Sequence, residues 1–523
     1  MKKILFKDIS RENIGQKFEM LGQIETVKQT SGPTLMILND GTAHFTFKAF
    51  IKPGVRAYPE VDIGDIVKVE AKINQRHDGI EAEASFMRKV NNQEKEEFKK
   101  NLNQLNEDRL EPQCKEFSIK SQMFESQKKR FIKVAKIIKS AIIEGRPILL
   151  RHNADCDGYS SAITIERAII SFMNKVTGDD RNAQFQNYKR APSKAPFYEY
   201  EDSVKDISNW LRDRNRSGAK PPLIIITDNG STQEDILSIS QMKIYDSQIV
   251  VVDHHYPGEV KDEKVLVDKY IDAHINPYLT GYDSNISAGM LGFELARFID
   301  EDSNNSVFIP AMSAILDHTK GTEREQYIQK AEKEGFTQDY LQILGEIVDM
   351  QSHYFRFMES REFFDDLFGN NMDMQKKIVE LLEPELKLRY QAVEKVAKYY
   401  STVKDYGKFK LITFDGERGT FRGEYPAIGK TTNHIHSVFE QESEKPIITL
   451  TYGSTFMTIR VSDGINHFSV PDFVTKVFEK IPFSNSNGGG HERAGSVRFV
   501  EYAKDDILKL FDIYLKEINN KNN

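Results

Sequence analysis

Acidic and histidine residues directly follow three apolar runs in the middle of the chain. The runs are ILLRHN, LIIIT and IVVV, and the residues that follow them are Asp155, Asp157, Asp228, Asp253, His254 and His255. Short apolar runs of this kind are typical of strands buried on both faces of a parallel sheet. Because ligands bind outside the carboxyl ends of such strands, we expect these side chains to share one crevice. One aspartate alone could simply cap a helix, but three such strand ends predict a site.

The donor atoms of this crevice predict a metal centre. Several carboxylates cannot stay ionised side by side without compensating cations. Carboxylate and imidazole without thiolate favour Mn²⁺, with Mg²⁺ as the alternative, over structural zinc. Two such ions suit phosphoester hydrolysis, because they activate a water and clamp the attacked phosphoryl group. We therefore expect two divalent metal ions as cofactors.

Four segments, HNADCDGYSSA, TDNGS, VVDHH and the distant GGGHERAG, occur in an order that resembles the DHH phosphoesterase superfamily. The pattern is similar to RecJ-like single-strand exonucleases, especially the archaeal RecJ-related nucleases. The resemblance implies that Asp155 and Asp157 each bind one metal and that Asp228 bridges both. It also implies that His254 is a ligand with Asp253 orienting it, and that His255 faces the scissile phosphate.

Two further ligands are implied by the same resemblance. The fourth motif is degenerate, and we assign its aspartate to Asp317 in PAMSAILDHTKG, although a helix cap is the alternative. Many relatives place a ligand histidine where this chain has Arg151. His152 is then the candidate ligand, with a plain hydrogen-bonding role as the alternative.

The C-terminal motif predicts a phosphate-binding loop. Gly488, Gly489 and Gly490 allow a turn with exposed N–H groups, an anion-binding nest, and His491 can donate to a phosphate oxygen. In the family this loop belongs to the DHH-associated domain and holds substrate opposite the metals. Alternation in FMTIRVSD places Arg460 opposite the apolar residues, where it contacts phosphate or is a solvated edge arginine.

The order of patterns along the chain predicts an α/β protein of several domains. We expect an OB-like nucleic-acid-binding β-barrel at 1–90, a polar linker or helix at 91–123, and a doubly wound parallel-sheet DHH domain at 124–321. A helical connector at 322–402, broken at Pro384, and a smaller α+β DHH-associated domain at 403–523 follow. Phe45 and Phe47 are expected in the barrel core rather than stacking on bases, and YKRAPSK is expected to be a solvated basic loop or a DNA contact.

Composition limits the class of protein. Two cysteines among 523 residues exclude a disulfide framework and a cysteine zinc site, and favour the cytoplasm. No stretch approaches the roughly 18 apolar residues that span a bilayer, so no membrane association is expected. The net charge of −7 argues against coating nucleic acid by bulk charge, but allows a local basic groove.

The leading functional hypothesis is a two-metal exonuclease on single-stranded DNA or RNA in repair, recombination or replication, with proteins of those processes as partners. The first alternative is a phosphodiesterase for short oligoribonucleotides or cyclic dinucleotides. The second is a non-catalytic replication scaffold, which the retained acidic residues disfavour.

Overall fold

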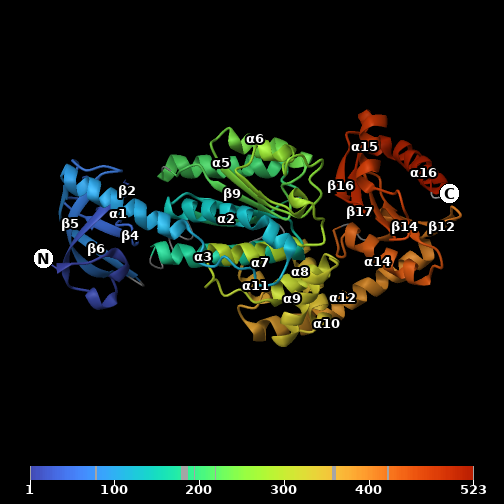
Figure 1. Cartoon of the computed structure of the whole chain (residues 1–523), viewed down its shortest axis with the longest axis horizontal. Helices are drawn as coiled ribbons and strands as arrows, with labels where there is room; N and C mark the ends of the chain where they lie inside the picture. The colour runs from blue at the N-terminus through green and yellow to red at the C-terminus, as the bar shows by residue number, and fades with distance from the viewer. Residues whose placement is uncertain are drawn as a thin grey trace.

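The computed structural model describes residues 2–76, 79–177, 187–193, 195–217, 219–355, 361–420 and 423–521. It places a β-barrel at one end of the molecule, an α/β domain in the middle and a smaller α+β domain at the other end (Figure 1). The predicted mixed α/β fold class is therefore confirmed.

The N-terminal barrel is closed. Its strands are β2 (Lys17–Gln29), β3 (Thr34–Asn39), β4 (His44–Ala49), β5 (Ile66–Arg76) and β6 (Gly79–Lys89), in the order β2-β3-β4-β6-β5 with β5 pairing back to β2. A two-residue strand, β1 (Lys2–Lys3), pairs in parallel with the start of β2. Phe47 is buried and packs against Phe6 and Phe45, as expected for a core phenylalanine. The helix α1 (Asn92–Leu110) follows and its Arg109 donates to the carbonyl of Thr42 at 2.7 Å.

The middle domain is a doubly wound parallel sheet. Its strands are β7 (Ile148–His152), β8 (Tyr188–Pro192), β9 (Leu223–Thr227), β10 (Gln248–Val252) and β11 (Ala273–Ile275), in the order β11-β10-β9-β7-β8. One face is covered by α2 (Gln122–Ile143), α3 (Cys156–Thr177) and α7 (Ala288–Ile299). The other face is covered by α5 (Tyr200–Ser217) and α6 (Ile236–Lys243). Strand order reverses at β7, so the crevice between the ends of β7 and β9 is the expected ligand position.

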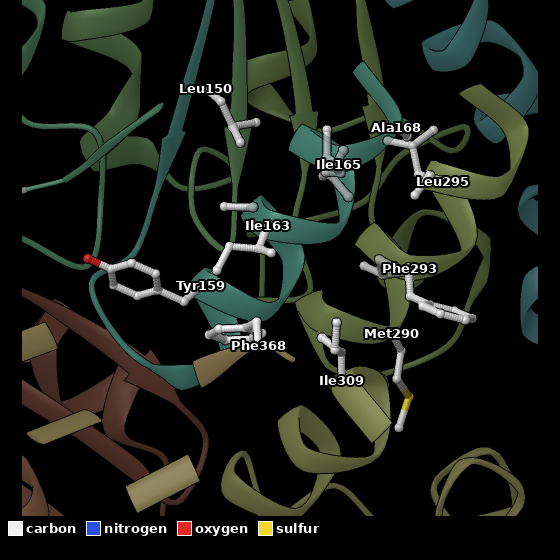
Figure 2. Close-up of a cluster of buried hydrophobic side chains, with 14 of the residues drawn as sticks. Leu150, Tyr159, Ile163, Ile165, Ala168, Met290, Phe293, Leu295, Ile309 and Phe368 are labelled. Atoms are coloured by element: carbon white, nitrogen blue, oxygen red, sulfur yellow. The ribbon is translucent and has the colours of Figure 1, made fainter. Parts of the chain in front are cut away.

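The core of this domain joins the sheet to the helices. Figure 2 shows side chains from β7 (Leu150), α3 (Ile163, Ile165) and α7 (Met290, Phe293) among this buried cluster. Glycine lets α3 and α7 approach closely, because a Cβ at Gly292 would lie 2.4 Å from the hydroxyl of Ser161. The packing fixes the start of each helix, and both starts carry residues of the site described below.

One predicted loop is wrong. YKRAPSK contributes the edge strand β8, in which Arg190 is buried and its Nε donates to Glu166 at 2.7 Å. The basic residues of this segment predicted a solvated loop, but Glu166 of α3 neutralises the side chain of Arg190. Lys194 lies outside the described residues.

A helical segment links the middle domain to the C-terminal one. It comprises α8 (Phe308–Leu316), α9 (Thr322–Lys333), α10 (Gln338–Phe355), α11 (Arg361–Leu367) and α12 (Met372–Tyr400). The expected break at Pro384 is wrong, since this residue lies inside the continuous helix α12. Among the described residues, none of the helices combines the length and apolar character needed to cross a membrane.

The C-terminal domain is a six-stranded mixed sheet with helices. Its strands are β12 (Thr402–Asp405), β13 (Lys410–Asp415), β14 (Ile447–Tyr452), β15 (Phe456–Val461), β17 (Ala494–Arg498) and β16 (Asn487–His491), in that spatial order. The helices α14 (Ile428–Glu442), α15 (Val470–Lys480) and α16 (Lys504–Lys521) pack on it. The smaller α+β domain predicted from the sequence is thus confirmed.

Candidate metal centre and substrate cleft

The ends of β7, β9 and β10 bring the predicted acidic and histidine residues together. Nε2 of His254 lies 3.4 Å from Oδ2 of Asp157 and 3.3 Å from Oδ1 of Asp228. Nδ1 of the same ring lies 3.7 Å from Oδ2 of Asp317, which follows the last residue of α8. Asp317 is the C-terminal cap residue of α8, and its side chain faces the centre.

Two overlapping groups have donor atoms close enough to hold a cation. The first is Asp228, His254 and His255, and the second is Asp157, His254 and Asp317. In each group the donor atoms lie within 4.8 Å of one another. His254 belongs to both groups, so it would hold a cation together with Asp228 or with Asp157 and Asp317.

Asp157 is held by the start of α7. Its Oδ2 accepts from the N–H of Ala288 at 2.8 Å, and its Oδ1 accepts from the N–H of Gly289 at 2.8 Å. The hydroxyl of Ser313 also donates to Oδ1. The positive end of the helix dipole stabilises a carboxylate at this place. Nothing in the sequence singles out Ser313, because it lies within the apolar run of α8.

Asp155 and His152 flank the turn between β7 and α3. Asp155 accepts from the side chain of Asn153 at 2.6 Å and from the N–H of Gly158 at 2.9 Å. Nδ1 of His152 lies 2.6 Å from the carbonyl of Asn153, which assigns the proton to Nδ1 and leaves a lone pair on Nε2. This buried Nε2 has no hydrogen-bond partner in the described part of the chain.

Asp253 holds both histidines that follow it. Its Oδ1 accepts from the N–H of His254 at 2.8 Å and lies 2.8 Å from Nδ1 of His255. The carboxylate thus orients the ring of His255, whereas the family resemblance implied that it orients His254. Nε2 of His255 is then the ring atom that can act on a substrate.

Burial and mutual repulsion shift the pKa values in this centre. Burial, together with the charges of Asp155 and Asp157, raises the pKa of Asp228 well above its usual range. Burial also raises the pKa of Asp317 to about 7, against the opposing effect of His254. Burial opposes ionisation of Asp253 as well, but His255 outweighs it and lowers the pKa. Carboxylates that resist ionisation in this way are the ones that a cation would stabilise.

The donor set fits divalent cations. Burial, followed by the charge of Arg190, lowers the pKa of His152 to about 3, so this imidazole stays neutral and can act as a ligand. Oδ2 of Asp228, like Nε2 of His152, is buried without a hydrogen-bond partner among the described residues. Unpartnered buried polar atoms are costly unless a ligand or ion completes them.

Asp253 and His255 line a cleft of about 1470 Å³ between the middle and C-terminal domains. Arg460 lines the wall opposite the centre, while its neighbours Met457 and Ile459 are buried behind it, as the alternation predicted. Its strand β15 lies between β14 and β17, so Arg460 is not a solvated edge residue. The side chain of Asn433 accepts a hydrogen bond from its Nε.

The three glycines of the C-terminal motif also line this cleft. They do not form the predicted turn: they lie in the edge strand β16, paired with β17 through Gly488–Val497, Gly489–Ser496 and Gly490–Gly495. The tight pairing explains the glycines, because a Cβ at Gly488 would lie 2.5 Å from the carbonyl of Ser496. His491 ends this strand, but its side chain lies outside the described residues, so its contact with phosphate stays a prediction.

Two neighbouring glycines are expected to respond differently to alanine. Gly490 has φ +141°, and a Cβ there would lie 2.3 Å from the carbonyl of Ala494. Gly490→Ala should therefore lower the melting temperature by several degrees, for a loss of about 1–3 kcal/mol. Gly489→Ala is the matched control, since a Cβ added there would meet no atom within 4 Å. Differential scanning fluorimetry measures both, and equal melting temperatures would contradict the strain at Gly490.

Comparison with known proteins shows the family. Residues 148–328 match the family model described as the DHH family, N-terminal domain. A solved structure of the DHH domain of a member of the S1p family of ribosomal proteins is 34% identical, with a TM-score of 0.77, and the match covers 82% of this chain and 99% of that one. The chain belongs to the DHH family. An uncharacterized protein of Methanocaldococcus jannaschii is 37% identical over 98% of this chain and 71% of its own length.

Membership of the DHH family supports a hydrolase of the phosphoesterase type, and the donor atoms described above fit divalent cations. RecJ from Thermus thermophilus in complex with Mn²⁺ shares the fold, with a TM-score of 0.51 and 14% identity over 77% of this chain and 56% of that one. The strand-end motifs of this DHH protein lie within the matched residues, whereas the glycine strand lies beyond them.

Proposed function

We propose that this DHH-family hydrolase is an exonuclease that degrades single-stranded DNA or RNA with two divalent ions, preferably Mn²⁺, in repair, recombination or replication. The observation that carries the proposal is that Asp253 and His255, at the edge of the acidic and histidine centre, line one wall of a 1470 Å³ cleft. Small-molecule sites usually have volumes of about 300–1,000 Å³. The larger cleft supports a segment of polymer as the substrate.

The proposed roles follow from the contacts of each residue. Asp155, Asp157, Asp228, His254, Asp317 and His152 would hold the ions, which supply an activated water and neutralise charge on the phosphoryl group. Asp253 fixes the ring of His255 through Nδ1, which directs Nε2 to the scissile phosphate. Arg460 and the backbone of Gly488 to Gly490 bind phosphate oxygens from the opposite wall.

The direct test uses single-stranded DNA and RNA of matched sequence, labelled at either end and incubated with Mn²⁺ or Mg²⁺. Stepwise shortening from one end is the expected result, and the label that is released first gives the polarity. Duplex of the same sequence is the control substrate. If neither single strand is shortened with either metal, the exonuclease proposal is wrong.

A small-substrate phosphodiesterase is the second candidate. It would cleave dinucleotides or cyclic dinucleotides and leave chains longer than about 10 nucleotides intact. A groove for single strands, by contrast, usually contacts about 4–16 nucleotides. The exposed aromatic residues of the cleft favour the polymer instead. Tyr256 directly follows His255 and is 45% exposed, and Phe478 on α15 is 39% exposed, yet both line the cleft.

Tyr256→Ala separates these two candidates. Stacking of one base on an aromatic ring contributes about 1–3 kcal/mol, so the variant should raise KM for a single-stranded 20-mer about 5- to 150-fold. Hydrolysis of a dinucleotide should change less. Tyr502→Ala is the matched control, since Tyr502 is exposed and does not line the cleft. An unchanged KM for the 20-mer would remove Tyr256 from the proposed path of the strand.

A further inference from the structure

Helix α10 of the connector holds the turn that carries Asp155. Oδ1 of Asp349 accepts from the N–H of Cys156 at 2.6 Å. One turn further along α10, the hydroxyl of Ser352 donates to the carbonyl of Ala154 at 2.9 Å. These two bonds lie on either side of Asp155 in the chain, and both α10 side chains are buried. The backbone position of Asp155 is therefore set from outside the motif.

The second oxygen of Asp349 contacts the C-terminal domain. Nζ of Lys430, in the first turn of α14, forms an ion pair with Oδ2 of Asp349. Ile428 and Gly429, which directly precede Lys430, line the substrate cleft. One carboxylate thus contacts the metal-binding turn with one oxygen and the far wall of the cleft with the other.

The surroundings of Lys430 hold it in this place. Its Nζ lies 4.0 Å from Oε1 of Glu346, also on α10. Oε2 of Glu346 accepts hydrogen bonds from the hydroxyls of Tyr390 at 2.7 Å and Tyr425 at 3.0 Å. The ammonium therefore lies between two carboxylates of α10 that are themselves fixed. Loss of a buried counter-charge leaves its carboxylate partners repelling each other, so that they no longer hold their positions.

A second ion pair joins the same two parts of the molecule without touching the turn. Lys320, beyond α8, lies 2.8 Å from Asp463 of the C-terminal domain, and these side chains are 72% and 76% exposed. Exposed pairs contribute little to stability and orientation. This pair provides an internal control for a link between the domains that has no contact with Cys156.

We propose that Asp349 and Lys430 are positioning residues that couple the place of the C-terminal domain to the geometry of the metal-binding turn. When the C-terminal domain lies against α10, Lys430 holds the carboxylate of Asp349 in place. Asp349 in turn holds the N–H of Cys156, which lies between Asp155 and Asp157 in the chain. Partners that orient metal ligands in this way typically change metal affinity or activity by about 10- to 100-fold when removed. The inference rests on the metal centre of the proposed function and is independent of the substrate.

The test uses Asp349→Ala, Asp349→Asn, Lys430→Met and the control Lys320→Met in the full chain. Hydrogen exchange read by mass spectrometry reports the peptide that contains Cys156, and electron paramagnetic resonance of free Mn²⁺ reports metal affinity. Asp349→Ala should lose protection of this peptide and bind Mn²⁺ about 10- to 100-fold more weakly. Lys430→Met should shift both measurements in the same direction, although it lies in another domain, and Lys320→Met should shift neither.

Asp349→Asn keeps an acceptor for the N–H of Cys156 but cannot pair with Lys430. It should retain more protection than Asp349→Ala, and it keeps the test decisive if the alanine variant does not fold. Because the two residues act through one contact, adding Lys430→Met to Asp349→Asn should cause no further loss. Additive losses would contradict the coupling.

Other outcomes would overturn the proposal. If Lys430→Met behaves like Lys320→Met in both measurements, the C-terminal domain does not control the turn. If Asp349→Ala keeps wild-type exchange and Mn²⁺ affinity, Asp349 does not position it. Both measurements are made without nucleic acid, so a wild type that fails to shorten single strands would reject the exonuclease proposal alone. A wild type that binds no Mn²⁺ would reject the metal centre, and the exchange data would still decide the coupling.

Discussion

Asp228→Asn is expected to reduce phosphodiester hydrolysis on the order of 10³-fold, which corresponds to about 4 kcal/mol of transition-state stabilisation. The reason is that Asp228 lies within reach of His254 and His255 and close to the charges of Asp155 and Asp157. A neutral amide is a much weaker ligand than a carboxylate for a divalent ion. Asparagine also tolerates the left-handed backbone of this position, at φ 57°, so the fold should be kept.

The same substitution should raise the melting temperature of the metal-free protein. Burial and neighbouring carboxylates raise the pKa of Asp228, so its ionised form destabilises the folded state. Below the usual aspartate pKa of about 4 the side chain is neutral in both folded and unfolded chains, and the difference vanishes. The advantage of asparagine should therefore be present at pH 7 and shrink as the pH falls towards 4.

Calorimetry with and without Mn²⁺, together with the single-strand assay, measures both effects. The control is Asp246→Asn, because Asp246 has nearly the same backbone conformation, at φ 58°, but is exposed. Wild-type cleavage by Asp228→Asn would show that the assigned centre is not the active one. A lower melting temperature of the metal-free variant would contradict the proposed repulsion.

Arg151→Met is expected to lower the free energy of unfolding by about 3–5 kcal/mol. Nε and Nη2 of Arg151 bind the carboxylate of Asp206 at 3.0 and 2.5 Å, and Nη1 lies 3.4 Å from Asp202. All three side chains are at most 7% exposed. Methionine preserves the packing of the stem but leaves two buried carboxylates of α5 without their cation.

Thermal unfolding should show this loss as a fall of about 10 °C or more in melting temperature. Lys205→Met is the matched control on the same helix, since Lys205 and Glu201 form an exposed pair at 3.2 Å. Arg151→His should be similarly destabilised and should not gain metal affinity, because the side chain of Arg151 points towards α5. A melting temperature close to that of wild type would contradict a structural role for Arg151.

The strands and the ends that carry the site were predictable from the sequence. The apolar runs of β9 and β10 are uninterrupted because both faces of these strands are covered, and an acidic residue follows each run at once, whereas Arg151 and His152 end β7 before Asp155. The edge strand β8 could not be predicted, since Arg190 is expected to be solvated until Glu166 is known to lie beside it. The continuity of α12 through Pro384 was not predictable either, because proline usually ends or kinks a helix.

The parts of the site that depend on long-range packing were not predictable. Ser313 and Asp349 contact the motif residues from 156 and 193 positions away, and neither stands in a recognisable pattern. Which of the two histidine rings Asp253 contacts depends on the directions of the side chains at the end of β10. The order of the residues alone does not give these directions. The glycines predicted as a turn form a strand, because glycine serves equally for close pairing and for turning.

The closed barrel lies at the end of the molecule away from the cleft (Figure 1). A nucleic acid held by both must therefore extend along the whole catalytic domain before its end reaches His255. Short oligomers would engage only one of the two places at a time. The barrel would then increase the affinity for substrates above a certain length, through avidity, and would not contribute to the chemical step.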